Sequence, residues 1–345
     1  MLVLFAKKDG NNMYNFPKVE LHVHLDGSLN PNLAYELALK DHLIDDTLPY
    51  DEFVKDMVAP QHIDHLWEFL KCFDLPIALM QSKENIAVLT QDVCQQVLRD
   101  NVCYAELRYA PGQHLQKGLS LDEVMQCVDD VVNEFNQSQN QCIVKIIHCM
   151  MIDPSLKNDD INWEVIQLTT KYLSRNVVAI DLAGPEGTVN MEYYAPFFAY
   201  AKQCNIPFTI HAGEVGAASN VAKALSFGTK RIGHGCNSIL DEHVVQLVKD
   251  SNALLEVCLS SNVQCKNQPS YQQHPIKPLV EKGVKCCINC DNRTLTNITL
   301  DDEYDHCIRE LGFSENDLIQ FNLNAVDGAF IDESTKQRLR QLFVH

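Results

Sequence analysis

The sequence predicts an α/β protein, a (β/α)8 TIM barrel with additional helices between strands 1 and 2 and at the C-terminus. Eight short apolar runs recur along the 345 residues, and segments with helical periodicity separate them. The runs alternate little between apolar and polar residues, which favours a parallel sheet covered by helices. Eight such units favour a closed barrel over an open doubly wound sheet.

The apolar runs are the expected strands, in the order in which the chain presents them. They cover residues 18–25, 101–110, 142–151, 177–184, 207–214, 231–235, 254–262 and 284–292. Between them, segments such as 121–135 and 244–255 carry apolar residues at every third or fourth position, which predicts amphipathic helices.

Two segments fall outside this repeat. Residues 30–100 are longer than one crossover helix requires, and the tail after residue 296 is predicted to be helical. The first of these segments contains an apolar stripe at i, i+3, i+4 and i+7, formed by Leu66, Phe69, Leu70 and Phe73. Such a stripe usually packs in a core, and a lid or pocket wall is the alternative. No linker or repeat divides the chain, so we expect a single domain over residues 1–345.

Composition excludes several classes of function. The formal net charge of −18 would repel phosphate backbones and acidic membrane surfaces, so we expect neither a nucleic-acid polymer nor a membrane as partner. No apolar run approaches the roughly 18 residues of a membrane span, and the N-terminal run is too short for an export signal. A small-molecule substrate and a cytoplasmic location are expected. The sequence leaves the oligomeric state open, and a monomer is plausible.

The 14 cysteines are dispersed through a long chain, which favours reduced thiols over a disulfide scaffold. Cys287 and Cys290 have the C-x-x-C spacing of metal and redox sites. They lie in an expected strand, where positions i and i+3 face opposite ways. A structural role is therefore the better interpretation of this pair.

Histidines and one aspartate occupy the carboxyl ends of several expected strands, where barrel enzymes place their catalytic groups. His22 and His24 share one face of the first strand, about 7 Å apart. His211 ends the fifth strand, His234 the sixth and Asp291 the eighth. Nitrogen ligands with one carboxylate suit Zn²⁺ better than Ca²⁺ or Mg²⁺. The pattern predicts one metal ion per chain, most simply zinc.

Glu214 follows His211 by three residues, past an Ala-Gly turn, and can face the same cavity without binding the metal. A carboxyl group in a dry pocket has a raised pKa and can carry protons. A bound metal lowers the pKa of water toward neutrality. Together with His234, these features indicate hydrolytic chemistry.

The other polar residues receive a structural interpretation. Asp181 and Glu186 lie near the end of the fourth strand, where a hydrogen-bonded or solvated carboxylate is the default. His148 lies alone in an apolar strand. The remaining histidines do not lie with other candidate ligands at strand ends and are interpreted as surface residues. They are His42, His62, His65, His114, His243, His274, His306 and His345.

Five motifs, in order and over nearly the whole chain, resemble those of the metal-dependent adenosine deaminase family of the amidohydrolase superfamily. They read HVHLDGS, DLAGPE, TIHAGEVG, RIGHG and CDN. Each motif alone is weak, and five in sequence are highly specific. The resemblance implies a zinc-dependent hydrolysis of adenosine, and of 2'-deoxyadenosine, to inosine and ammonia.

The resemblance also implies roles for single residues. The zinc ligands would be His22, His24, His211 and Asp291. Glu214 would protonate the purine N1 and make C6 electrophilic. His234 would orient or deprotonate the attacking water and stabilise the developing oxyanion, and Asp291 would also touch that water.

Substrate contacts follow from the same resemblance. The main-chain N–H of Gly184 would bind purine N3, where a side chain would prevent close approach. Asp26 would bind the ribose 5'-hydroxyl, with His24 beside the substrate. The apolar stripe would line a hydrophobic subsite under a lid, and consists of Leu66, Phe69, Leu70 and Phe73.

The sequence departs from the family pattern at Asn292, where the family usually has a second aspartate facing purine N7. An aspartate must be protonated to donate a hydrogen bond to N7, whereas an asparagine amide donates at any ordinary pH. We expect activity to survive. The change bears on affinity and on the tolerance for altered purines.

Four alternatives differ from this interpretation in residues that the sequence shows. Two-metal amidohydrolases carry a lysine at the end of the fourth strand, and VVAIDLAG has none. Adenine deaminases share the chemistry but typically have glutamate where Asp26 stands, which leaves less room for ribose. A catalytically silent purine-binding barrel would be expected to lack Glu214 or Asp291. The zinc site of cytidine deaminases is excluded because the chain contains no P-C-x-x-C.

Overall fold

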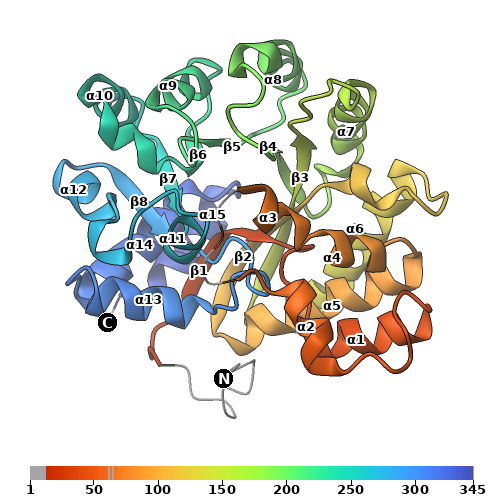
Figure 1. Cartoon of the computed structure of the whole chain (residues 1–345). Coiled ribbons are helices and arrows are strands. Elements are labelled where there is room, and N and C mark those ends of the chain that lie inside the picture. The colour runs from red at the N-terminus through yellow and green to blue at the C-terminus, as the bar shows by residue number, and fades with distance from the viewer. Residues whose placement is uncertain (1–12, 61–62, 64–65, 345) are drawn as a thin grey trace.

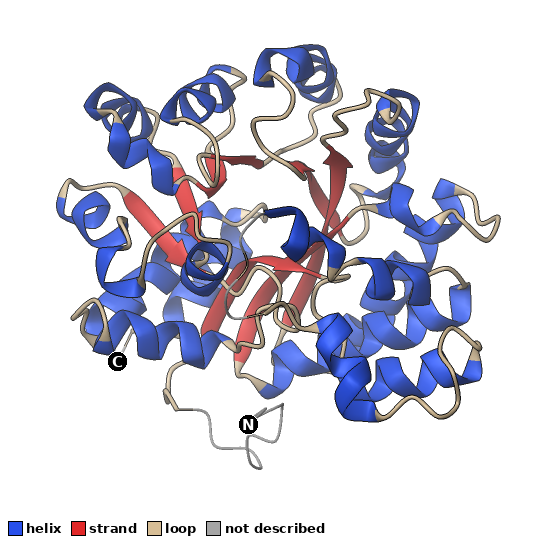
Figure 2. Ribbon diagram, in the orientation of Figure 1, coloured by secondary structure: helices blue, strands red, loops and turns tan. Residues whose placement is uncertain are grey.

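The computed structural model describes residues 13–344, except for 61–62 and 64–65 and the side chains of Leu66 and Trp67. The strands are β1 Lys18–His24, β2 Val102–Tyr109, β3 Ile143–Met151, β4 Val177–Ala183, β5 Ile210–Ala212, β6 Arg231–His234, β7 Leu254–Val257 and β8 Lys285–Ile288. Helices follow the strands in turn and surround them (Figure 1; Figure 2).

The helices are α1 Pro31–Lys40, α2 Tyr50–Met57, α3 Leu66–Lys71, α4 Asp74–Leu79, α5 Lys83–Arg99, α6 Leu121–Ser138, α7 Asp159–Tyr172, α8 Ala195–Gln203, α9 Ala218–Ser226, α10 Glu242–Asp250, α11 Leu259–Gln264, α12 Ile276–Glu281, α13 Leu300–Arg309, α14 Glu315–Gly328 and α15 Glu333–Gln341. Four short 3-10 turns accompany them, at Pro111–His114, Met191–Tyr194, Cys236–Leu240 and Tyr271–Gln273. Helix α6 begins with a capping box, in which Ser120 and Glu123 satisfy each other's backbone N–H groups.

The strands form a closed ring of parallel neighbours. β1 to β4 pair in order, and so do β5 to β8. Two parallel bridges join these halves, one between Ile180 and Phe208 and one between Val23 and Asp291. The second seam is held by hydrogen bonds from Asp291 N to His22 O (2.9 Å) and from His24 N to Asp291 O (2.7 Å). The predicted barrel and its eight strand positions are confirmed.

Several predicted boundaries are wrong, for local reasons. The strand expected over 254–262 ends at Val257, and α11 begins at Leu259. The helix expected over 244–255 ends at Asp250, since Leu254 already pairs in β7. The fifth strand is only Ile210–Ala212, because the glycine-containing turn after Ala212 leaves the ladder. The apolar stripe of 66–73 does not lie on one helix, because α3 ends at Lys71 and Phe73 lies in the turn just before α4.

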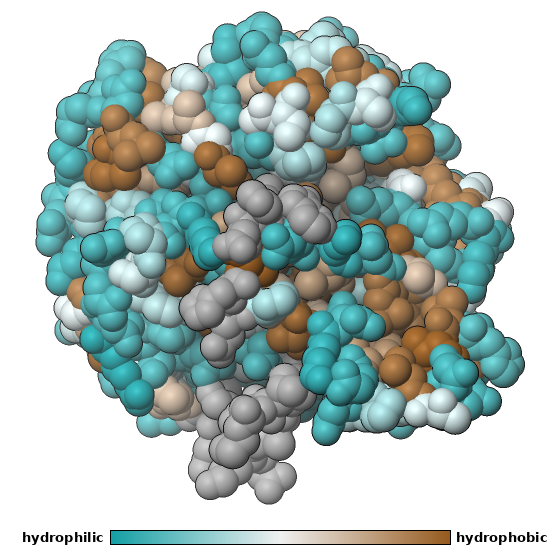
Figure 3. Space-filling model, in the orientation of Figure 1, coloured by the Kyte–Doolittle hydropathy of each residue, from teal (hydrophilic) through white to brown (hydrophobic). Residues whose placement is uncertain are grey.

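The segment between β1 and β2 holds α1 to α5, and the tail after β8 holds α13 to α15, as predicted. In Figure 1, α3 lies across the open end of the ring. That face is mainly hydrophilic, with scattered hydrophobic patches (Figure 3). Among the described helices, none has the combination of length and apolar composition needed to cross a membrane.

Charged side chains fill the interior of the barrel below the open end. Arg108 and Arg231 are buried and both pair with Glu256, while Arg231 also pairs with Glu106. Buried charges are tolerated only when they are paired and hydrogen-bonded. The network therefore fixes the position of Glu256, which also contacts His22 at the open end of the barrel.

Candidate active site

A single cavity of about 310 Å³ opens at the carboxyl ends of the strands. Its volume falls within the range of about 300–1,000 Å³ typical of ligand pockets. The predicted site residues that line it are His24, Asp26, Phe69, Leu70, Phe73, Gly184, His211, Glu214, His234, Asp291 and Asn292. His22 lies buried beside them in β1, with its ring 4.6 Å from that of His211. The side chain of Leu66 lies outside the described part of the chain.

Four side chains converge as a potential metal site. Ligand atoms of His22, His211, His234 and Asp291 lie within 4.8 Å of one another. This group differs from the predicted set, because it contains His234 in place of His24. His24 adjoins it nonetheless, with Nε2 3.3 Å from Asp291 Oδ1.

Backbone strain marks two of these residues. His234 has φ 60° and Asp291 has φ 62°, in the left-handed region that non-glycine residues rarely occupy. Such conformations persist only where the surrounding structure enforces them, and they concentrate at functional sites. Here the strain occurs where β6 and β8 give way to the loops at the cavity.

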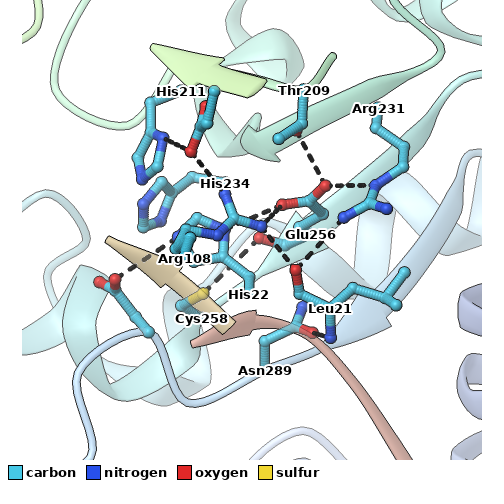
Figure 4. A network of polar contacts seen from close by, with 12 residues as sticks. Leu21, His22, Arg108, Thr209, His211, Arg231, His234, Glu256, Cys258 and Asn289 are labelled. Atoms are coloured by element: carbon cyan, nitrogen blue, oxygen red, sulfur yellow. Dashed lines mark hydrogen bonds and ion pairs between the residues drawn. The ribbon is translucent and has the colours of Figure 1, made fainter. Parts of the chain in front are cut away.

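Two buried carboxylates, Glu256 and Asp181, each contact one imidazole; His22, His211 and Glu256 are labelled in Figure 4. His22 Nδ1 lies 3.0 Å from Glu256 Oε2, and His211 Nδ1 lies 2.9 Å from Asp181 Oδ2. A carboxylate can only accept, so each Nδ1 carries the proton and each Nε2 offers its lone pair to the cavity. His22 Nε2 is buried without a hydrogen-bond partner, as a metal ligand would be before its ion is added.

Arg108 joins these two carboxylates. Its Nη1 donates to Asp181 at 2.8 Å and its Nη2 donates to Glu256 at 2.7 Å. Burial alone would raise the pKa of Asp181, but the neighbouring His211 imidazole and the Arg108 guanidinium hold it below its usual value. Sequence reasoning missed Glu256 and Arg108. A charged residue inside an otherwise apolar strand was the available signal.

Glu214 lies in the cavity on a loop that Glu186 holds in place. The Glu186 carboxylate accepts main-chain N–H groups of Gly213, Glu214 and Gly216 at 2.7, 2.9 and 3.0 Å. Burial, with a smaller contribution from the Asp291 charge, raises the pKa of Glu214 to about 8. Glu214 Oε2 lies 3.7 Å from His234 Nε2. An acid with a raised pKa thus faces an imidazole of the potential metal site.

The residues predicted to contact the substrate line the same cavity. Asp26 is buried, its Oδ1 has no hydrogen-bond partner, and burial raises its pKa to about 7. Gly184 has φ +113°, and a Cβ there would lie 3.2 Å from Ile152 O, so glycine is required. A Cβ on Gly27 would lie 1.9 Å from Asn292 Oδ1, so Asn292 packs directly on that glycine.

Two histidines that were interpreted as surface residues are buried. His114 is fully buried and its Nε2 lies 3.9 Å from Asp26 Oδ2. His274 is 2% exposed and contacts Asn262, which in turn contacts His234. The prediction was wrong for both, because His114 ends a short 3-10 turn and His274 lies in the loop before α12, and neither segment has a periodicity that reports burial. Cys287 and Cys290 are buried free thiols, in agreement with their structural interpretation.

The family model described as adenosine deaminase matches residues 17–344. The chain belongs to the adenosine deaminase family. An adenosine deaminase of Clostridium perfringens is 34% identical over 95% of this chain and 98% of its own length.

Solved structures support the same architecture. An adenine deaminase from Arthrobacter aurescens superposes with a TM-score of 0.86 at 22% identity, covering 95% of this chain and 98% of the other, which shows a shared fold. The apo N6-methyl-AMP deaminase of Arabidopsis thaliana gives a TM-score of 0.81 at 25% identity, covering 95% and 96% of the two chains. Both superpositions show the same barrel fold over nearly the whole chain.

Proposed function

We propose that this chain hydrolyses adenosine, and 2'-deoxyadenosine, to inosine and ammonia in the cavity at the open end of the barrel. The observation that carries the proposal is the position of Glu214, a protonated carboxyl. It lies beside His234, which with His22, His211 and Asp291 forms the imidazole–carboxylate cluster. Water supplies the oxygen that replaces the amino group at C6, and the amino group leaves as ammonia.

The residues fit one zinc ion. His22 and His211 present Nε2 lone pairs, and Asp291 supplies a carboxylate. We assign His24 as the remaining ligand because its Nε2 lies 3.3 Å from Asp291 Oδ1. When bound, Zn²⁺ supplies Lewis-acid chemistry that lowers the pKa of water toward neutrality.

The chain's own groups perform the remaining tasks. Glu214 donates its proton to purine N1, which draws electrons from C6 and prepares it for attack. His234 Nε2 faces the same centre and binds the oxygen that develops negative charge. The ring is held by the Gly184 N–H at N3 and by the Asn292 amide at N7. Phe69, Leu70 and Phe73 cover its apolar face.

The charge of the cavity favours a neutral nucleoside over a nucleotide. Among the described residues that line it, none is lysine or arginine. Five acidic side chains line it instead: Asp74, Asp153 and Asp291, together with Asp26 and Glu214, whose pKa values burial raises. A 5'-phosphate would meet like charge, which costs several kcal/mol when it is not compensated.

The decisive assay follows absorbance loss from adenosine, adenine and AMP side by side, with metal analysis of the same sample. We expect adenosine to be deaminated and AMP to have a kcat/KM lower by about 10²-fold or more. Adenine as the preferred substrate would overturn the nucleoside assignment and favour an adenine deaminase. AMP turnover equal to that of adenosine would contradict the charge argument, and no turnover would favour a silent binding protein.

Replacing Asp26 by alanine or glutamate is expected to lower kcat/KM for adenosine by about 10–100-fold, because the 5'-hydroxyl loses its hydrogen bond to the buried carboxyl group. The same variants should change kcat/KM for 5'-deoxyadenosine little, since that substrate lacks the hydroxyl. Steady-state kinetics on both substrates measures the difference. Equal losses on both would show that Asp26 does not contact the 5'-hydroxyl.

A cytoplasmic location accords with the cysteines. All 14 are free thiols in the structure, and most are buried. Chains that pass through oxidising compartments more often form disulfides.

A further inference from the structure

A line of buried polar groups leads from the start of α12 to His234. Ile276 N donates to His274 Nδ1 at 3.2 Å. His274 Nε2 lies 3.2 Å from Asn262 Oδ1, and Asn262 Nδ2 lies 3.1 Å from His234 Nδ1. These three side chains are at most 2% exposed. Water therefore does not compete for their hydrogen bonds.

The position of each proton follows from the first group in the line. A main-chain N–H can only donate, so His274 Nδ1 must be an acceptor and its proton must be on Nε2. Burial lowers the pKa of His274 to about 3, so the ring is neutral. Its Nε2–H then donates to Asn262 Oδ1.

A second donor supports this orientation of the Asn262 amide. Cys236 Sγ lies 3.3 Å from Asn262 Oδ1 and 3.6 Å from His274 Nε2. Burial raises the pKa of the Cys236 thiol, which keeps its proton. With Oδ1 accepting from both neighbours, the amide NH₂ of Asn262 faces His234.

We infer that Asn262 and His274 are positioning residues that hold His234 as the Nε2–H tautomer, so that it donates a hydrogen bond to the reacting centre and does not ligate the metal. An amide NH₂ at Nδ1 leaves that nitrogen as an acceptor, and the single proton of the neutral ring stands on Nε2. His22 and His211 have the opposite arrangement, with carboxylates at Nδ1 and free Nε2 lone pairs.

This inference rests on the proposed function and narrows it. His234 belongs by distance to the four-residue cluster, but its hydrogen-bond partner separates it from the ligands. An Nε2–H tautomer of His234 can stabilise the developing oxyanion, but it has no lone pair on Nε2 with which to deprotonate the attacking water. His24 then remains as the third imidazole ligand.

The substitution Asn262→Asp tests the inference with almost no change in shape. A carboxylate accepts only, so the His234 proton should move to Nδ1 and leave Nε2 bare. A bound divalent cation disfavours an additional imidazolium charge nearby. In the zinc-loaded enzyme we expect kcat for adenosine to fall by about 10²–10⁴-fold. KM should change less than about threefold, because Asn262 does not line the cavity.

Nitrogen-15 NMR of histidine-labelled, zinc-loaded protein reports the tautomer directly, with a His234→Gln sample to assign the signal. We expect wild-type His234 to show a bare Nδ1 and a protonated Nε2, and Asn262→Asp to show a protonated Nδ1. A wild-type spectrum with a protonated Nδ1 would overturn the inference, even if the variant does not fold.

Asn322→Asp is the matched control. Asn322 is 1% exposed, lies on α14, and bonds Tyr304 and Leu318 away from the cavity. Its kcat should match the wild type whatever its stability. An equal loss of kcat in both variants would show that a buried charge alone causes the effect. If wild-type protein deaminates none of the purines tested, the proposed function fails, while the NMR result still decides the tautomer.

Discussion

Replacing Glu214 by glutamine is expected to reduce kcat for adenosine by about 10²–10⁴-fold, with little change in KM or in bound metal. Glutamine has the shape of glutamate and can still donate a hydrogen bond to purine N1, but it cannot transfer a proton. The raised pKa of Glu214, about 8, shows why the native carboxyl holds the proton needed at neutral pH. Steady-state kinetics and metal analysis measure the three quantities.

Glu303→Gln provides a matched control. Glu303 is buried like Glu214, and burial also raises its pKa to about 8. It lies on α13, accepts from Ser260 N at 3.0 Å and does not line the cavity. We expect near wild-type kcat for this variant. Wild-type rates in Glu214→Gln would refute its role as proton carrier.

The strand ends were predictable because they depend on local pattern. Apolar runs locate strands, and a parallel barrel brings all their carboxyl ends to one rim. His22, His211 and Asp291 therefore meet although they are far apart in the chain. The same reasoning could not choose between His24 and His234, since both stand at strand ends and only their hydrogen-bond partners differ.

The hydrogen-bond partners of these histidines could not be predicted from the local sequence pattern. His22 and Glu256 are separated by 234 positions, and Arg108 and Glu256 by 148. Their pairing depends on strand register across the barrel, which a one-residue shift would change. The prediction that His274 lies at the surface was wrong for a related reason. It precedes α12 in a loop, and its burial follows from how that loop packs beneath α11.

Removing the metal with a chelator is expected to abolish deamination and lower the thermal midpoint, and Zn²⁺ should restore both. Without a cation, the Nε2 lone pair of His22 has no hydrogen-bond partner. The Nε2 lone pair of His211 and the carboxylate of Asp291 face the same small space. A bound cation replaces this repulsion by coordination, and binding to the native state alone stabilises it by about 4 kcal/mol at a thousandfold excess over Kd.

The variant Asp291→Asn separates the effect of losing the metal from a general loss of stability. Its thermal midpoint should not respond to chelator or to Zn²⁺, because the site has lost its only carboxylate ligand. Asp129→Asn is the control: Asp129 is buried on α6 and pairs with Arg175, so this variant loses stability but should keep the full response to Zn²⁺. Unchanged activity in metal-free wild-type protein would mean that the imidazole–carboxylate cluster serves only to hold the barrel mouth together. Glu214 and His234 would then have to activate water alone.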